Sequence, residues 1–454
     1  MDYALVSDKS SRAQVIFAML SASQQEESCK AMAQRLANSS PLSGQARSRS
    51  GEAKFAGIHT VGAIMLGLSA GVLVFYPYLV EGYLSNMILA VLLSCMFLEI
   101  CNRRLVSPTI TSVSILLPFI VFPIVTLFPA ESPQQQSWIL RWSVVFPVAI
   151  VCGFLIQTSR ERPKYFYGFG LIGAITVLLA GYERITASAI FDRLISNQSF
   201  EYFIEGGIAR AVVGSSHPLV LGVLFAALVP WGVRRNLVPR ACWASWMAIG
   251  AYCTGSEGPT YISIALVTLV VAAPIRTFIA DRIAIAYLAF FAVMATLIYY
   301  SAFVWDIEVY GADSVSFSRG YREGMYSLFI DAVLAHPFGY LGAGIPSGEW
   351  LLITQYKGIR DLAVSIDSEL VYLAFEWGMI GCAFFIVTVL IGLKCYRRSQ
   401  PVALNLLALS GCGFFIATHA FLELGIFWMI AIGCAGSIAL SKAGEDRIVQ
   451  LEKE

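Results

Sequence analysis

The stretch SIDSELVYLAFEWGMIG, residues 365–381, turns from polar to apolar within a few positions, and the apolar run continues to residue 393. A run of roughly 20 apolar residues is enough to cross the hydrocarbon core of a bilayer as a helix. Upstream, SRGYREGMYSLFIDAVLAHPFGYLGAG, residues 318–344, carries arginines and a His-Pro pair. Ionisable groups beside hydrocarbon cost free energy unless they are neutralised or used. This junction therefore predicts a membrane helix with a functional surface at one end.

The same apolar pattern recurs along most of the chain. Of its 454 residues, 57% are hydrophobic and only 13% are charged, and the mean hydropathy is +0.70. Soluble domains carry about 25% charged residues. The predicted fold class is therefore all-α, a polytopic bundle of about twelve transmembrane helices. We expect these spans near 58–80, 84–100, 109–129, 138–157, 165–181, 216–233, 238–254, 258–274, 281–303, 366–393, 403–419 and 422–440.

Basic residues predict the orientation of the bundle, because Lys and Arg accumulate in short cytoplasmic loops. Every second connection is basic, and both termini fall on that side, which predicts that they are cytoplasmic. Two long connections, at about 182–215 and 304–365, are then expected on the outer face. The basic residues that set this orientation are Arg103, Arg104, Arg160, Arg162, Lys164, Arg234, Arg235, Arg240, Arg276, Arg282, Lys394, Arg397 and Arg398.

The two ends of the chain differ from the middle. Residues 1–55 are rich in Ser, Ala and Gln, which predicts a disordered cytoplasmic tail with one amphipathic helix over 13–36. The patch VIFAML within it resembles the apolar core of a signal peptide but is shorter than such a core needs to be. We expect a transmembrane domain over 56–440 and a cytoplasmic C-terminal tail over 441–454.

The expected outer loops carry arginines against the positive-inside trend. Because a guanidinium presents a planar fork of donors that suits phosphate oxygens, an anionic ligand is one explanation. Pairing with neighbouring carboxylates or lipid headgroups is the other. The arginines are Arg184, Arg193, Arg210, Arg319, Arg322 and Arg360, and three histidines, His217, His336 and His419, are expected on the same face. No metal-ligand spacing and no basic run typical of nucleic-acid binding accompanies them.

Arg319 and Arg322 are three positions apart in a segment of helical pattern, so they share one face of the predicted helix. Met325 continues that stripe, which predicts a helix lying on the membrane surface. The helix is expected to end before Pro337. Aromatic residues in and after it have flat amphipathic faces that suit either carbohydrate or the membrane interface. These are Tyr326, Tyr340, Trp350 and Tyr356.

Asp367 stands where loop turns into helix and has two interpretations. An aspartate at a helix N-cap, with Glu369 in the first turn, is ordinary for a helix start. The other interpretation makes Asp367 a general base that takes the proton of an attacking hydroxyl. Local sequence leaves both open.

Residues 318–381 resemble the O-antigen ligase and polymerase family, bacterial membrane enzymes that join glycans carried on undecaprenyl diphosphate. Ligases of that family carry His, then Asn, Ser or Gln, nine residues, Gly, two residues, and Gly, Thr or Tyr. Asp367, Ser368, Gly378 and Gly381 fit this spacing, with Asp in place of His. GGIARAVVGSSHPLVLG, residues 206–222, is similar to the family's Arg, Gly and X-Pro pattern. TGSEGP, from residue 254, is similar to its S-R-G-P, with Glu where the family often has Arg.

The resemblance implies a polymerase of O-antigen or exopolysaccharide repeat units at the periplasmic face of the bacterial inner membrane. The activity would be an inverting glycosyl transfer that needs no metal or other cofactor. The implied partners are an undecaprenyl-diphosphate-linked oligosaccharide, membrane lipids and a chain-length regulator, but no nucleic acid. The implied catalytic residues are Arg210, Arg319 and Asp367, and the implied substrate-binding residues are Arg322, His217, His336, Glu369 and Tyr326.

Two other functions stay open. A ligase that transfers glycan to lipid A core would share the donor and the arginines, but the aspartate at the ligase histidine position favours a polymerase. A transporter or flippase of lipid-linked sugars is the second alternative. Three ionisable residues inside predicted spans favour this alternative, namely Arg141, Glu376 and Glu423.

Overall fold

The computed structural model describes most of the chain, and contacts divide it into two units, 1–58 and 59–454. Of the first unit only the beginning of helix α2 is described. The described residues are 46–80, 83–102, 133–159, 162–191, 203–205, 208–234, 236–272, 282, 314–354, 358–362, 366–396, 400–414 and 416–451. The predicted helix over 13–36 and the predicted spans at 109–129 and 281–303 therefore lie outside them.

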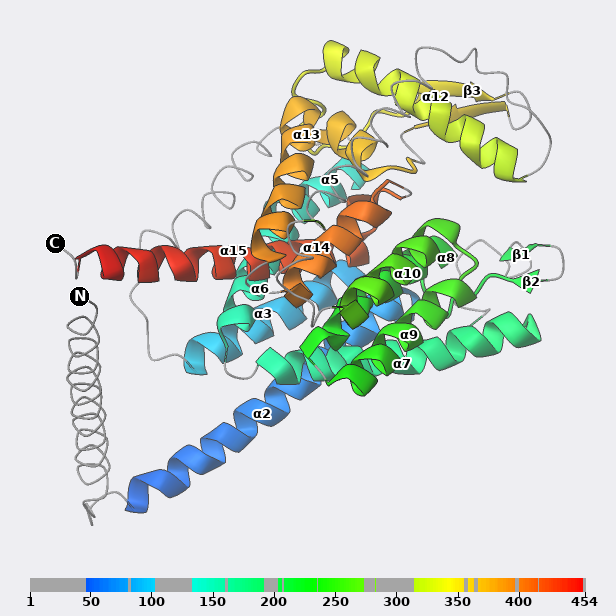
Figure 1. The fold of residues 1–454 in the computed structure, drawn as a ribbon. Coiled ribbons are helices and arrows are strands. Elements are labelled where there is room, and N and C mark those ends of the chain that lie inside the picture. Colours follow the sequence, from blue (N-terminus) through cyan, green and yellow to red (C-terminus); the bar gives the residue numbers. More distant parts are fainter. Residues whose placement is uncertain are drawn as a thin grey trace, which may run out of the picture. The chain divides into compact units, whose positions relative to one another are not determined.

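Helices make up nearly all of the described structure (Figure 1). The first half contains α2 (Ala46–Phe75), η1 (Pro77–Val80), α3 (Leu84–Asn102), α5 (Pro133–Leu140), the π-helical turn η2 (Arg141–Val145), α6 (Phe146–Thr158), α7 (Arg162–Thr186), α8 (Pro218–Leu228), η5 (Val229–Arg234), α9 (Leu237–Cys253) and α10 (Glu257–Ala272). The second half contains α12 (Ser314–Ala335), α13 (Glu369–Tyr396), α14 (Gln400–Cys412), η6 (Thr418–Ala420) and α15 (Leu422–Leu451).

Three described helical segments are long and apolar enough to span a membrane, namely Ser137–Thr158, Arg162–Thr186 and Glu369–Tyr396. Several others are apolar but shorter, such as Pro218–Gly232 and Leu422–Ile438. The expectation of a mostly helical protein with membrane-spanning helices is therefore confirmed. The finer expectation of about twelve spans stays a prediction.

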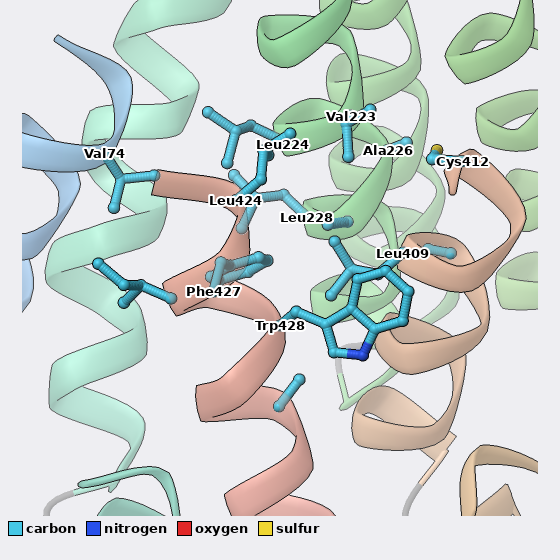
Figure 2. Packing of buried hydrophobic residues seen from close by; sticks show 14 of the residues in the cluster. Val74, Val223, Leu224, Ala226, Leu228, Leu409, Cys412, Leu424, Phe427 and Trp428 are labelled. Carbon is cyan, nitrogen blue, oxygen red and sulfur yellow. The ribbon is translucent and has the colours of Figure 1, made fainter. Parts of the chain in front are cut away.

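Helix α8 is buried around its whole circumference, because apolar residues occupy every face of it. Its neighbours include α9, α10 and α14. Figure 2 shows this packing, with Val223, Leu224, Ala226 and Leu228 of α8 near Leu424, Phe427 and Trp428 of α15 and Leu409 and Cys412 of α14. A helix without a polar face lies either in a protein interior or against lipid, and the burial of its residues places α8 in the interior. The chain on either side of α8 is consequently held by the protein core.

Glycines allow α6 and α15 to cross at close range. A Cβ atom built on Gly153 would overlap the backbone oxygen of Ile430, and one built on Gly433 would overlap that of Ile150. Small residues that let two helix backbones approach are typical of helix pairs in membranes, where no hydrophobic force drives helices together. This crossing brings the π-helical turn η2, which directly precedes α6, close to the start of α15.

The two expected outer loops contain structure that the sequence did not predict. Helix α7 continues to Thr186, so that Glu183 and Arg184 lie in its last turn rather than in a loop. Each loop also holds a short antiparallel hairpin, β1 (Ile204–Glu205) with β2 (Ile208–Ala209), and β3 (Leu351–Thr354) with β4 (Gly358–Asp361). Neither hairpin has enough alternating residues to be recognised in the sequence.

Helix α12 ends at Ala335, directly before His336 and Pro337, as expected. Its apolar stripe, however, packs on protein. Met325 is fully buried in a cluster with Val371 and Phe375 of α13. The stripe that was expected to face the membrane surface is therefore used to hold α12 against α13.

Candidate functional site

A kink in α13 receives the loop that follows α12. Gly378 has φ +56° and ψ −135°, values that interrupt the helix and that favour glycine. The interruption leaves backbone amide and carbonyl groups of α13 without partners inside the helix, and the loop after α12 forms hydrogen bonds with them. The amide of Tyr340 donates to the Phe375 oxygen at 3.0 Å, and that of Met379 donates to the Pro337 oxygen at 2.9 Å. A Cβ at Gly378 would overlap the Pro337 oxygen.

The second glycine of the motif is also explained by packing. A Cβ on Gly381 would overlap the backbone oxygen of Leu373. The amide of Gly344 donates to the Glu376 carboxylate at 3.3 Å, and the amide of Gly342 donates to the Glu376 backbone oxygen at 3.1 Å. Both glycines therefore have a mechanical role, since Gly378 admits the loop after α12 and Gly381 lets the segment beyond the kink lie against the backbone at Leu373.

The first residue of α13, Glu369, lies in a closed polar cage. Its carboxylate accepts hydrogen bonds from the Thr418 hydroxyl at 2.8 Å, from the His419 amide at 3.0 Å and from Nδ1 of the His419 ring. Glu369, Thr418 and His419 are all 0% exposed. A carboxylate buried with three donors is fully compensated. His419 is therefore buried inside the protein, and the expectation that it lies at or near the outer face of the membrane stays a prediction.

Aromatic rings enclose the other side of His419. Trp142 stacks on the imidazole with ring centroids 5.4 Å apart and an interplanar angle of 9°. Trp428 and Phe146 lie 5.0 Å and 5.5 Å away. The Nε2 atom of His419 is buried and has no hydrogen-bond partner in the described part of the chain. Glu369 thus fixes the ring through one nitrogen and leaves the other facing aromatic walls.

Arg141 donates hydrogen bonds to the backbone beside this cage. Its Nη1 donates to the carbonyl oxygens of Ala420 at 2.9 Å and His419 at 3.3 Å, and its guanidinium lies 4.2 Å from the ring centroid of Trp138. Arg141 starts the π-helical turn η2. π-helical turns are rare in proteins, and those that occur often lie at functional sites. The partners of Arg141 are backbone oxygens and an aromatic face, which suit a charge away from water.

A hydrogen bond connects this region to the segment before α8, which belongs to the first expected outer loop. The Ser216 hydroxyl donates to the carboxylate of Glu423 at 2.8 Å. Glu423 lies in the first turn of α15, shortly after His419. Residues that are about 200 positions apart in the sequence therefore meet where α8 and α15 begin. The loop before α8 and the start of α13 consequently belong to one polar region.

Two arginines converge on the turn between α9 and α10. Arg210 donates from Nη2 to the Ser256 hydroxyl at 3.3 Å and from Nε to the Thr254 oxygen at 3.5 Å. A Cβ on Gly255 would lie 2.9 Å from Cγ of Arg210 and 3.1 Å from Nη1 of Arg184. We call Arg184 and Arg210 the arginine pair. Two segments that were singled out separately in the sequence, around Arg210 and at TGSEGP, are thus in contact.

Glu183 holds the arginine pair in place through the backbone rather than as an ion-pair partner. Its carboxylate accepts from the amides of Val212 at 2.8 Å, Val213 at 2.9 Å and Ile190 at 3.1 Å. It is 1% exposed. This buried carboxylate therefore fixes the chain just after Arg210. Sequence analysis missed it, although an acid inside an otherwise apolar helical run is a signal that could have found it.

His217 caps helix α8 and is partly exposed. Its Nδ1 accepts from the amide of Leu219 at 3.1 Å, at the first turn of the helix. Burial, and secondly the charge of Arg210, lower the pKa of His217 to about 4. The imidazole is therefore neutral at pH 7, as an acceptor at a helix N-terminus must be.

We expect acid to weaken the fold through His217. Below about pH 6.5 the unfolded chain binds a proton at this residue, whereas the folded chain does so only below its lowered pKa. Stability is therefore lost as the pH falls from about 6.5 to 4. Melting temperatures of the detergent-purified protein between pH 7 and pH 4.5 measure this loss. In His217→Asn, which keeps a cap but does not titrate, the slope is expected to be shallower, and an unchanged slope would assign the acid sensitivity elsewhere.

The remaining predicted site residues are distributed over the second outer loop. Arg319 and Arg322 lie in α12, but their side chains are outside the described residues. Nε2 of His336 lies 3.1 Å from the Glu349 carboxylate. Tyr326 is buried and donates to the Phe414 oxygen at 3.3 Å, so it is a packing residue. Tyr340 accepts from Trp350 Nε1 at 2.6 Å, and burial and a hydrogen bond to Glu349 raise its pKa.

Asp367 precedes α13 by two positions and is partly exposed. The first amide of the helix, that of Glu369, donates to the Gly413 oxygen at 2.6 Å. The helix start is therefore held in part by another segment, and the two interpretations of Asp367, helix cap and general base, both stay open. Neither the role of Asp367 as a base nor that of Arg210 as an anion ligand is tested by these contacts.

In the part of the chain that the structure describes, no group of three or more His, Cys, Asp or Glu side chains could hold a metal ion. No protein-family model matches the chain, and comparisons with curated proteins and with solved structures find no match. The resemblance to the O-antigen ligase and polymerase family therefore depends on the motif residues alone.

Proposed function

We propose that the protein is a polymerase that joins undecaprenyl-diphosphate-linked oligosaccharide repeat units at the outer face of the bacterial inner membrane. The observation that carries this proposal is the arginine pair at the Gly255 turn. The side chains of both arginines reach this turn, and guanidinium groups present planar forks of donors that suit the oxygens of a diphosphate. The neighbouring carboxylate of Glu183 is already used by three backbone amides.

In this reaction a sugar hydroxyl of one lipid-linked unit attacks the anomeric carbon of another. The new glycosidic bond forms as the bond to undecaprenyl diphosphate breaks, and the hydroxyl proton passes to a base. Negative charge grows on the leaving diphosphate, so fixed cationic donors stabilise the transition state more than the ground state. Arg210, one member of the arginine pair, and Arg319 are assigned this role of diphosphate clamp, as the resemblance implies, and Arg184 supports Arg210 at the Gly255 turn. Asp367 is assigned the role of base.

The buried charges that suggested a transporter have local partners. Arg141 binds backbone oxygens, Glu376 accepts from Gly344, and Glu423 accepts from Ser216. These contacts fix the helices on which the proposed site is built. A ligase remains the alternative within the same chemistry, because it differs only in its acceptor.

Reconstitution distinguishes these functions. Protein in liposomes is given an undecaprenyl-diphosphate repeat unit, with and without lipid A core. A ladder of longer lipid-linked chains supports the polymerase, and a single addition to lipid A core identifies a ligase. Absence of transfer, together with movement of the repeat unit across the bilayer, would identify a transporter and overturn the proposal.

Asp367→Asn is the sharpest single substitution at the proposed base. Asn removes the basic carboxylate but can still begin a helix, so we expect an unchanged melting temperature and a loss of transfer of about 100-fold or more. Initial rates of ladder formation measure the loss. Asp331→Asn is the matched control, since Asp331 is an exposed carboxylate on α12. Wild-type turnover in Asp367→Asn would leave this residue with a structural role only.

A further inference from the structure

A large cavity lies away from the proposed site, at the opposite end of α7 from the arginine pair. Its volume is about 350 Å³, within the range of small-molecule sites. Its walls come from α7, α14, α15 and the chain around Trp231 and Trp243. Tyr167 is 60% and Leu171 is 41% exposed, so the cavity opens on the outer side of α7. This helix is one of those that can span a membrane, and an exposed apolar face on such a helix is the face expected to meet lipid.

The cavity is polar at one end and apolar along the rest of its length. Arg162, the first residue of α7, and Gln157, near the end of α6, line the polar end. The Oε1 atom of Gln157 is buried and has no hydrogen-bond partner among the described residues. Buried polar atoms are nearly always hydrogen-bonded, so an unsatisfied one indicates a missing partner. The missing group must be a donor, since Oε1 can only accept.

The length of the cavity matches one leaflet of a bilayer. Its lining on α7 runs along one face from Arg162 to Ala174, which corresponds to roughly 18 Å of helix at 1.5 Å per residue. Half of a hydrocarbon core is about 15 Å thick. Beyond the polar end the walls are mainly aromatic and aliphatic, with Trp231 and Phe427 among them. A cavity with these dimensions suits a single acyl chain that hangs from a headgroup at the membrane surface.

We propose that this cavity binds an anionic phospholipid of the phosphatidylglycerol type, with one acyl chain in the cavity, the phosphate on Arg162 and a headgroup hydroxyl donating to Gln157. The charge of Arg162 favours an anionic lipid over a zwitterionic one. The hydroxyl requirement favours glycerol over a headgroup that lacks donors. This site takes no part in the glycan transfer proposed above, so either proposal can fail without the other.

Native mass spectrometry of the full chain tests the proposal. Delipidated protein is titrated with phosphatidylglycerol and with phosphatidylcholine of the same acyl chains. A basic side chain at a membrane surface contributes about 1 kcal/mol to anionic-lipid binding, so we expect about fivefold tighter retention of phosphatidylglycerol. Arg162→Gln is expected to lose this preference. Lys164→Gln is the matched control and should keep it, because Lys164 is an exposed base on the same helix that does not line the cavity.

A second pair of variants tests the acyl chain. Ala174→Phe fills the deep end of the cavity and should weaken retention of both lipids. Leu178→Phe adds bulk one turn further along α7, on an exposed position outside the cavity, and should leave both unchanged. Equal retention of the two lipids by the wild type, or unaltered binding in both Arg162→Gln and Ala174→Phe, would overturn the proposal. Displacement of phosphatidylglycerol by an equimolar polyprenyl phosphate would also overturn it, in favour of that lipid.

Discussion

Arg210→Ala should abolish detectable polymer in the reconstituted assay while the protein stays folded in the membrane. Loss of one preorganised cationic donor at a developing negative charge typically costs about 100- to 1,000-fold in rate. The effect should fall on kcat rather than on KM, because the charge grows only in the transition state. Stability should change little, since the hydrogen bonds from Arg210 to Ser256 and Thr254 are long, at 3.3 and 3.5 Å, and such bonds contribute about 1 kcal/mol or less.

The controls separate charge from geometry. Arg210→Lys keeps the charge but loses the planar fork, so we expect an intermediate rate. Lys164→Gln removes a base elsewhere and should polymerise as the wild type does. Arg319→Ala is expected to match Arg210→Ala, because the resemblance assigns both arginines to the diphosphate. Full activity in both alanine variants would exclude the proposed diphosphate clamp.

The largest effect on stability is expected for Glu369→Ala. The substitution leaves the Thr418 hydroxyl, the His419 amide and the His419 ring without their acceptor inside the protein. Removing one partner of a buried charged network costs about 3–5 kcal/mol. Unfolding of the purified protein in detergent, followed by helical circular dichroism, measures the loss in free energy of unfolding.

Replacement of both partners provides the control. In Glu369→Leu combined with His419→Leu no buried charge or imidazole is left unpaired, so the double variant should be more stable than Glu369→Ala. Glu369→Gln should fall between Glu369→Ala and the wild type, because the amide oxygen can still accept from Thr418. A Glu369→Ala protein that unfolds like the wild type would show that the cage does not stabilise the fold.

Several elements could be predicted from the sequence because their causes are local. The end of α12 follows from Pro337, which cannot continue a helix. The start of α8 follows from His217 and Pro218, a cap and a proline at the first helical position. In contrast, the extension of α7 to Thr186 was missed, because Glu183 and Arg184 look like loop residues until the amides that Glu183 binds are known.

In the candidate site, too, single residues could be recognised from the sequence, whereas their contacts with distant segments could not. Arg210 and the TGSEGP turn were both recognised, but their contact was not, since 44 residues separate Arg210 from Thr254. Glu369 was recognised as a helix-start residue that might bind substrate, whereas its partners Thr418 and His419 lie about 50 residues away. The spacing of Gly378 and Gly381 was recognised as a motif, and only the packed structure gives it a mechanical reason.

The sequence alone established that this protein is mostly helical and has helices long and apolar enough to span a membrane, because hydrophobicity and length act within one segment and need no partner. It also determined which segments carry the arginines and the motif glycines. The packed three-dimensional structure was needed to show which charged residues contact each other, where α13 kinks and where a cavity large enough for a lipid chain opens. These features depend on helix crossings such as that of Gly153 and Gly433, where fractions of an ångström between distant segments set which polar groups can reach each other.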